Sequence, residues 1–168
     1  MEERIRKRKI VLVGTGFVGM SFAYSLLSEK GINELVLIDM NKDKAVGEQM
    51  DLSDGLPYAD SKMTIKAGEY EECGDADIVV ITAGAAQKPG QTRLELVGIN
   101  ARITKDVATQ VKNSGFKGIL VVASNPVDIM TYVAYKASGL PKEHVIGSGT
   151  ILDTARAQSR KVAIHVAI

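Results

Sequence analysis

Short aliphatic segments alternate with longer segments of helical periodicity along the whole chain. The aliphatic segments have the composition of buried parallel strands. They predict strands at Ile10–Val13, Leu35–Asp39, Lys62–Ala67, Ile78–Thr82, Ile119–Ala123 and Val145–Gly147. Apolar residues three or four apart predict helices over Phe17–Lys30, Lys42–Leu56, Thr92–Asn113 and Pro126–Ser138, and again near Ile151–Ser159. This alternation predicts an α/β fold with a doubly wound parallel sheet.

The ends of several elements carry their own signals. Gly31 is expected to cap the carboxyl end of the first helix, because glycine adopts the left-handed conformation found there. Asn41 is expected to cap the amino end of the second helix. At the end of the chain, apolar and other residues alternate over Val162–Ile168, which predicts a strand.

A glycine-rich turn follows the first strand. Gly14, Gly16 and Gly19 have the spacing G-x-G-x-x-G, directly before a helix that begins near Phe17. The first glycine permits a tight turn, the second lets a pyrophosphate approach the backbone, and the third lets the helix pack close to the sheet. The positive end of that helix would point at the phosphates.

An acidic residue ends the second strand. Asp39 lies twenty residues after Gly19, where a carboxylate is expected to bind the ribose hydroxyls of the adenosine. A carboxylate there also repels a 2′-phosphate, which favours NAD over NADP. The sequence therefore predicts a Rossmann NAD-binding domain. The alternative is a flavodoxin-like sheet whose glycine-rich turn binds no dinucleotide.

Composition and charge limit the range of partners. The chain has 168 residues, 45% of them hydrophobic and 24% charged, with a formal net charge of +1. This length suits one ordinary domain, and the near-neutral charge implies neither nucleic acid nor membrane as a partner. The basic segment Arg4–Lys9 is interpreted as a solvated lead-in to the first strand. We expect no metal site.

A single cysteine indicates the compartment. Cys73 cannot form a disulfide within the chain, which favours a reducing cytoplasm. It has no histidine nearby, so we interpret it as a small buried residue of the core rather than a nucleophile.

Two candidate segments follow the fourth and fifth strands, where ligands of such sheets bind. Thr82–Leu96 is rich in glycine and alanine and has the composition of a lid, which would carry Arg93 toward a substrate carbonyl. Alternatively, Arg93 is a solvated residue of a first helical turn. Asn125 either binds a ligand or caps the helix that begins at Pro126.

A third segment, Gly147–Arg156, follows the sixth strand. Asp153 and Arg156 are three residues apart and therefore share one face of a helix. They form either part of a site or a surface ion pair of little energetic value.

Together, the motifs G-T-G-F-V-G, A-G-A-A-Q-K-P-G-Q-T-R-L, S-N-P-V-D and G-S-G-T-I-L-D-T-A-R resemble the L-lactate dehydrogenase family, and bacterial NAD-dependent members above all. The resemblance runs from about Lys9 to Arg156. It implies an oxidoreductase that interconverts lactate and pyruvate with NAD. In the family, the residue at the position of Gln87 contacts the side group of the substrate and selects between substrates. Malate dehydrogenases have an arginine there, which binds a second carboxylate.

The resemblance also implies roles for individual residues. Arg93 would polarise the pyruvate carbonyl, Asn125 would contact substrate and the nicotinamide side, Arg156 would bind the substrate carboxylate, and Asp153 would orient a catalytic histidine. The expected cofactor-binding residues are Gly14, Gly16, Phe17, Val18, Gly19, Asp39, Thr82, Ala83, Gly84 and Asn125.

The histidine expected from the family lies in a G-E-H-G-D segment, which this sequence does not contain. Of its two histidines, His144 is expected to be exposed and His165 lacks the flanking residues of the motif. We therefore expect residues 1–147 to form the dinucleotide-binding domain and residues 148–168 to begin the connection to a substrate domain. The alternatives are a stand-alone NAD-binding module, a non-functional fragment, or a relative of malate dehydrogenase. A homo-oligomer is expected in each case.

Overall fold

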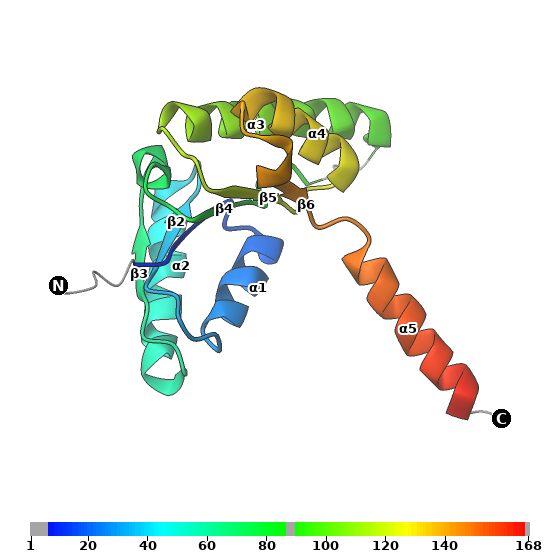
Figure 1. Ribbon diagram of the computed structural model, residues 1–168, viewed down its shortest axis with the longest axis horizontal. Coiled ribbons are helices and arrows are strands. Elements are labelled where there is room, and N and C mark those ends of the chain that lie inside the picture. The colour runs from blue at the N-terminus through cyan, green and yellow to red at the C-terminus, as the bar shows by residue number, and fades with distance from the viewer. Residues whose placement is uncertain (1–6, 87–89, 167–168) are drawn as a thin grey trace.

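The computed structural model describes residues 7–86 and 90–166, with the backbone alone described for residue 93 and residues 160–166. Six parallel strands alternate with helices (Figure 1). The strands are β1 (Lys9–Val13), β2 (Glu34–Ile38), β3 (Thr64–Ala67), β4 (Ile78–Ile81), β5 (Ile119–Val122) and β6 (Val145–Gly147). The α-helices are α1 (Phe17–Leu26), α2 (Lys42–Gly55), α3 (Arg93–Asn113), α4 (Val127–Ser138) and α5 (Ile151–Val166). Three short 3-10 helices, η1 (Leu56–Tyr58), η2 (Tyr70–Cys73) and η3 (Lys142–His144), complete the connections.

The sheet has the order β3-β2-β1-β4-β5-β6, so the chain runs outward from β1 in one direction and then in the other. Helices α1 and α2 lie on one face of the sheet and α3 and α4 on the other (Figure 1). The predicted doubly wound parallel sheet is therefore confirmed. In such a sheet, loops at the carboxyl ends of β1 and β4 separate at the switch of direction and leave room for a ligand.

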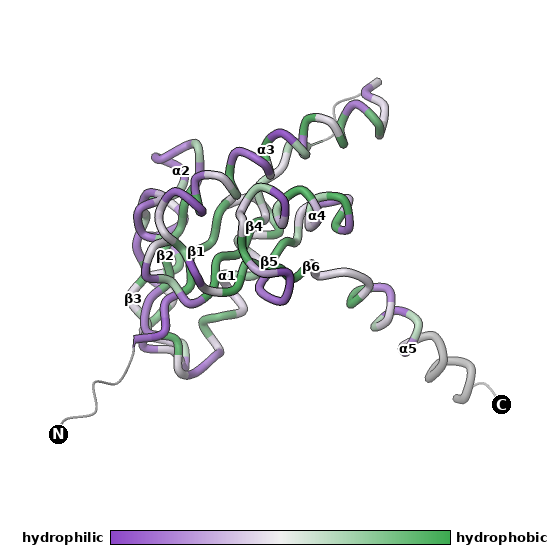
Figure 2. The backbone as a smooth tube through the Cα atoms, turned by 45° about the horizontal axis from the view of Figure 1, so that its top comes forward, coloured by the Kyte–Doolittle hydropathy of each residue, from purple (hydrophilic) through white to green (hydrophobic). Residues whose placement is uncertain are grey.

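Alternate residues of each central strand belong to opposite cores. Val11 and Val13 of β1 pack toward α3 and α4, together with Val107 and Met130 of those helices. Leu12, between them, packs toward α1 and α2. Both faces of β1 are thus covered by helices, which explains why Ile10–Val13 form an unbroken hydrophobic segment after Lys9. Figure 2 colours each residue of the chain by its hydropathy.

A cluster of ion pairs lies near the amino ends of β1 and β2. The Nζ of Lys9, whose side chain is only 6% exposed, is 2.6 Å from both Glu72 Oε2 and Asp75 Oδ1. Lys66 Nζ lies 2.6 Å from Glu34 Oε1 and 2.9 Å from Glu72 Oε1. Burial alone would lower the pKa of Lys9, but its hydrogen bonds to Asp75 and Glu72 outweigh burial and raise that pKa.

Two of the predicted helix ends can be compared directly. Asn41 caps α2 as predicted, because its side chain accepts a hydrogen bond from the Lys44 amide at 3.1 Å. Gly31 has a positive φ of 91° but does not cap α1, which ends at Leu26 rather than at Lys30. The prediction for Gly31 was wrong because a turn after Leu27 separates the helix from this glycine.

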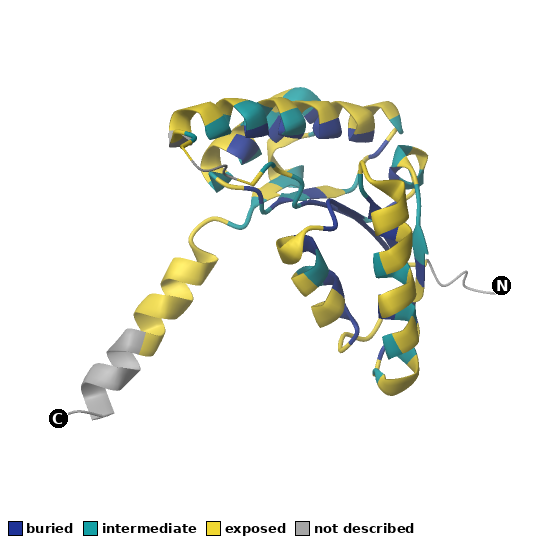
Figure 3. Ribbon diagram, turned by 180° about the vertical axis from the view of Figure 1, so that it is seen from behind, coloured by how far each residue is buried: buried dark blue, intermediate teal, exposed yellow. Residues whose placement is uncertain are grey.

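The end of the chain differs from its prediction. Residues up to Val166 continue α5, so the strand predicted from Val162 to Ile168 is wrong over its described part, and Ile168 lies outside the described residues. A lone strand would leave its backbone groups unpaired, whereas a helix pairs them internally. Helix α5 projects away from the sheet, and its residues from Ile151 to Ser159 are exposed (Figure 3). Within residues 7–86 and 90–166, no helix is long and apolar enough to span a membrane.

Candidate functional site: a cavity at the carboxyl ends of the strands

The glycine-rich turn links β1 to α1 and has the geometry that its three glycines predict. Gly14 has a φ of 104°, and a Cβ there would lie 2.6 Å from the Ala83 backbone nitrogen. A Cβ on Gly19 would overlap the Gly14 carbonyl oxygen, because α1 passes close to the turn. Around Gly16 the space is open, since a Cβ there would meet nothing within 4 Å. A ligand can therefore approach the backbone at Gly16.

The amino end of α1 is free to bind an anion. Its N-cap residue is Gly16, so no side chain caps the first amides, and its first turn contains no acidic residue. The unpaired amides and the helix dipole together favour a negative group at this position. Phe17, which is 97% exposed, and Val18 follow at the surface rather than in the core.

Asp39 directly follows β2, and its carboxylate is held from two directions. Its Oδ2 accepts hydrogen bonds from the Thr15 amide at 2.8 Å and the Thr15 hydroxyl at 2.9 Å. Its Oδ1 accepts one from the Asn41 amide at 3.0 Å. Burial alone would raise the pKa of Asp39, but these hydrogen bonds, with the nearby charge of Lys44, lower it below its ordinary value. Asp39 is therefore a fixed, ionised hydrogen-bond acceptor.

The strand β4 supplies the opposite wall. Thr82 follows it and donates from its hydroxyl to the Gly14 carbonyl at 2.7 Å. The Ala83 amide donates to the Val13 carbonyl at 3.0 Å. These bonds tie the loop after β4 to the glycine-rich turn across the switch point of the sheet.

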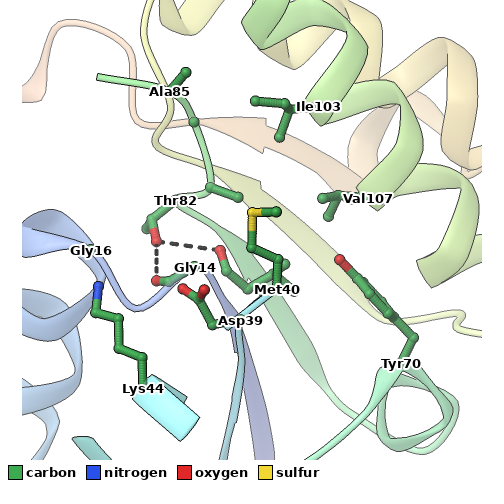
Figure 4. A pocket seen from close by; sticks show the side chains of 13 residues that line it. Gly14, Gly16, Asp39, Met40, Lys44, Tyr70, Thr82, Ala85, Ile103 and Val107 are labelled. Carbon is green, nitrogen blue, oxygen red and sulfur yellow. Dashed lines mark hydrogen bonds between the residues drawn. The ribbon is translucent and has the colours of Figure 1, made fainter. Parts of the chain in front are cut away.

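Between these loops lies a cavity of about 360 Å³ (Figure 4). Asp39 lies beside Gly14 in this view, with Lys44 and Tyr70 to either side and Ile103 and Val107 projecting from α3. The cavity brings together six of the predicted cofactor-binding residues, namely Gly14, Gly16, Asp39, Thr82, Ala83 and Gly84. Apolar walls with a few polar groups at defined points are typical of cofactor sites.

Some lining residues were not predicted from the sequence. Lys44 was missed because a lysine in the first turns of a helix has no distinctive pattern. Tyr70 was missed because η2 is too short to show periodicity. Burial raises the pKa of the Tyr70 phenol to about 12, so this side chain stays neutral beside the cavity. In the part of the chain that the structure describes, no three His, Cys, Asp or Glu side chains are grouped to hold a metal ion.

The predicted substrate-binding residues lie less closely together than the cofactor-binding residues do. Asn125 lies three residues after the end of β5 and is exposed. It does not cap α4, whose N-cap residue is Pro126, so that alternative was wrong. Asp153 and Arg156 lie on the projecting α5 and are 75% and 66% exposed, with 3.7 Å between Oδ1 and Nη1. Neither lines the cavity. Gln87 and the Arg93 side chain lie outside the described residues, and Arg93 is the first residue of α3.

His144, the histidine whose side chain the structure describes, does not line the cavity. His144 belongs to η3, is only partly exposed, and has an Nδ1 that is buried without a hydrogen-bond partner. The expectation that it is exposed was therefore wrong. The backbone of His165 is in α5.

Comparison with known proteins gives the family. Residues 8–147 match the model for the NAD binding domain of the lactate/malate dehydrogenases. The chain belongs to this family. An L-lactate dehydrogenase of Lactococcus lactis subsp. cremoris (strain NZ9000) is 57% identical over 153 residues, which are 91% of this chain and 49% of that protein. L-lactate dehydrogenase 2 of Enterococcus faecalis (strain ATCC 700802 / V583) is 55% identical over 153 residues, 91% of this chain and 48% of that protein.

Solved structures give the same result. A lactate dehydrogenase from a Medee basin deep-sea metagenome library has a TM-score of 0.90 and 54% identity, covering 98% of this chain and 52% of its own. The minor L-lactate dehydrogenase from Enterococcus mundtii, in its ligands-bound form, has a TM-score of 0.91 and 52% identity, covering 97% and 52%. The chain thus spans about half the length of these lactate dehydrogenase relatives. It contains the NAD-binding domain of this family, and its cofactor is NAD.

Proposed function

We propose that NAD binds across the cavity with its adenosine over β2, its pyrophosphate at the amino end of α1 and its nicotinamide over β4 and β5. The observation that carries this proposal is that Asp39, the glycine-rich turn and Thr82–Gly84 line one cavity. The residues that line the cavity fit NAD. Asp39 is an oriented carboxylate for the ribose hydroxyls, and the open space at Gly16 admits the pyrophosphate.

We further propose that the chain serves the interconversion of L-lactate and pyruvate, as the names of its relatives suggest. The nicotinamide, when bound, supplies or accepts the hydride. Among this chain's residues, Arg93 would polarise the substrate carbonyl and Arg156 would hold the substrate carboxylate in a two-pronged pair. Gln87 would accommodate a methyl side group, because a neutral amide does not need a counter-charge there.

Asn125 would complete the contact to the substrate and the nicotinamide, and Asp153 would orient a histidine. Residues 148–168 would begin the connection to a substrate domain. The exposed residues of α5 would then be covered by that domain, or by another copy of the chain in a homo-oligomer. The single buried Cys73 is in keeping with a reducing cytoplasm.

Cofactor titration tests the proposal. Asp39→Ala should weaken the binding of NADH by roughly ten- to one hundred-fold, because a charged hydrogen bond to the ribose is lost. It should also reduce discrimination against NADPH, since the charge that repels the 2′-phosphate is gone. The control is Asp51→Ala, at an exposed position further along α2. Unchanged NADH affinity in Asp39→Ala, measured by the fluorescence of the nucleotide, would sink the proposal.

The second candidate is an NAD-binding module without turnover. It is favoured by the position of Asp153 and Arg156, which lie exposed on α5 and outside the cavity. General acid–base catalysis contributes about a hundred- to ten-thousand-fold, and no histidine lines the cavity in the described part of the chain. We therefore expect NADH oxidation near background with pyruvate and with oxaloacetate.

Three results of that assay would change the assignment. Robust turnover that is lost in His165→Asn would make His165 the catalytic acid and reject the module. Turnover that survives this change would point to another proton donor or to a contaminating enzyme. A clear preference for oxaloacetate would favour a malate dehydrogenase relative.

A further inference from the structure

Asn100 connects two loops of the site from a buried position on α3. Its side chain is 5% exposed, and its Oδ1 accepts a hydrogen bond from the Ala85 amide at 2.8 Å. Its Nδ2 donates to the Asn125 carbonyl at 3.2 Å. One partner is a donor and the other an acceptor, so only one orientation of the amide satisfies both. Asn100 thus spans the carboxyl ends of β4 and β5.

The loop that Asn100 contacts is the one that lines the cavity. Gly84 and Ala85 both line it, and a Cβ on Gly84 would lie 3.5 Å from Asn100 Oδ1, in ordinary van der Waals contact. A second bond joins the same two loops, because the buried Ser124 hydroxyl donates to the Ala83 carbonyl at 2.7 Å. The two loops are therefore fixed relative to each other before any ligand binds.

The order of the strands indicates which half of the cofactor these loops meet. Asp39 follows β2, on one side of β1, and would hold the adenosine. Strands β4 and β5 lie on the other side of β1. This step rests on the proposed function, in which the pyrophosphate lies between them at the glycine-rich turn, so that the nicotinamide half meets the loops after β4 and β5.

We propose that Asn100 is a positioning residue for the nicotinamide half of the cofactor site. It acts through the Ala85 amide and the Asn125 carbonyl, and it does not touch the adenosine half. Its effect on binding is therefore confined to one end of the dinucleotide. A residue that merely stabilised the fold would weaken both ends together.

The test compares two ligands that share the adenosine and pyrophosphate. NADH carries the nicotinamide and ADP-ribose lacks it. In Asn100→Leu, which removes both hydrogen bonds, NADH should bind roughly three- to ten-fold more weakly while ADP-ribose affinity is unchanged. Isothermal titration calorimetry measures both affinities, and the ratio of the two is the readout.

A control and a milder variant accompany this test. Thr104→Val is the control, because Thr104 is also buried on α3, one turn later, but donates to Met130 Sδ at 3.3 Å between the helices. It should change neither affinity. Asn100→Asp keeps the acceptor for the Ala85 amide but places a carboxylate against the Asn125 carbonyl. Hydrogen exchange at Ala85 should then be protected as in the unaltered chain, while NADH still binds more weakly.

The outcomes separate this inference from the proposed function. Equal weakening of NADH and ADP-ribose in Asn100→Leu, or the same ratio change in Thr104→Val, would overturn the role of Asn100 while leaving NAD binding intact. If Asn100→Leu does not fold, the ratio measured in Asn100→Asp decides in the same way. If the unaltered chain binds neither ligand, the proposed function fails and this inference fails with it.

Discussion

Thr15 donates two hydrogen bonds to the same oxygen of Asp39, one from its amide and one from its hydroxyl, at 2.8 and 2.9 Å. The two residues lie on different loops, after β1 and after β2. The glycine-rich turn and the carboxylate of Asp39 are therefore a single hydrogen-bonded unit. Thr15 is 1% exposed, so water does not compete for these bonds.

Removal of the hydrogen bond from the Thr15 hydroxyl to Asp39 should change how the stability of the fold depends on pH. The folded pKa of Asp39 is lowered, so its contribution to stability is present above its unfolded pKa of about 3.9 and is lost as pH falls through the folded value. In Thr15→Val the hydroxyl bond is absent, so the folded pKa should rise toward the unfolded one. The contribution of Asp39 to stability should then be smaller, and its loss should be complete at a higher pH. Carboxyl NMR titration of Asp39 and urea unfolding between about pH 2 and 6 measure this.

The control for that prediction is Ser21→Ala. The Ser21 hydroxyl donates to the Phe17 carbonyl on α1 and does not contact Asp39. A pKa of Asp39 that is the same in Thr15→Val and Ser21→Ala would show that the hydroxyl bond does not hold the carboxylate in its charged form.

Two glycines of the turn should respond differently to the same substitution. Gly19→Ala places a methyl group on the Gly14 carbonyl oxygen and should lower the free energy of unfolding by about 2 kcal/mol or more. Gly16→Ala enters open space at a φ of −75°, so its stability should change by less than about 0.5 kcal/mol. NADH binding should nevertheless weaken by roughly ten-fold or more in Gly16→Ala, because its methyl displaces the pyrophosphate. Thermal melts that fall equally in both variants would contradict this.

Cys73 should be inert in the folded protein. Burial raises the pKa of its thiol to about 12, so the reactive thiolate is scarce at pH 8. Labelling by a disulfide reagent at pH 8 should therefore be negligible in buffer and rapid in urea. Fast labelling of the native chain would show that η2 opens readily. The sequence-based interpretation of Cys73 as a buried core residue is confirmed by its 0% exposure.

The chain should associate at high concentration. Ile151 and Leu152 are 72% and 59% exposed on α5, and Ile146 is exposed on the neighbouring edge strand β6. Exposed apolar groups that lie close together favour contact with another protein surface. Light scattering should show an average mass that rises with concentration, and Ile151→Ser with Leu152→Ser should reduce it. A monomer at every concentration tested would contradict the expected oligomer.

Much of the fold follows from local sequence rules. The strands can be recognised as continuous aliphatic segments because both faces of a parallel sheet are covered. The spacing of the glycines reflects close approaches at Gly14 and Gly19 and open space at Gly16. Asp39 could be predicted because its distance from the turn is set by one helix and one strand. Each of these signals lies within a single strand–helix–strand unit.

The remaining features depend on contacts between distant segments. The hydrogen bonds of Asn100 join positions 15 and 25 residues away, and no local pattern marks a buried asparagine as a connector. The end of the chain was mistaken for a strand because alternation was read without a neighbouring strand to pair with. The exposure of Arg156 could not be predicted either, since it depends on the direction of α5.

The ion-pair cluster of Lys9, Glu72 and Lys66 lies at the amino ends of the strands, whereas the cavity lies at their carboxyl ends. One end of these strands is therefore held by ion pairs, and the other end forms the cavity. Substitutions in the cluster should therefore change the thermal stability of the chain more than its affinity for NAD. We expect related chains to differ more at the amino ends of the strands than at the carboxyl ends, which line the cavity.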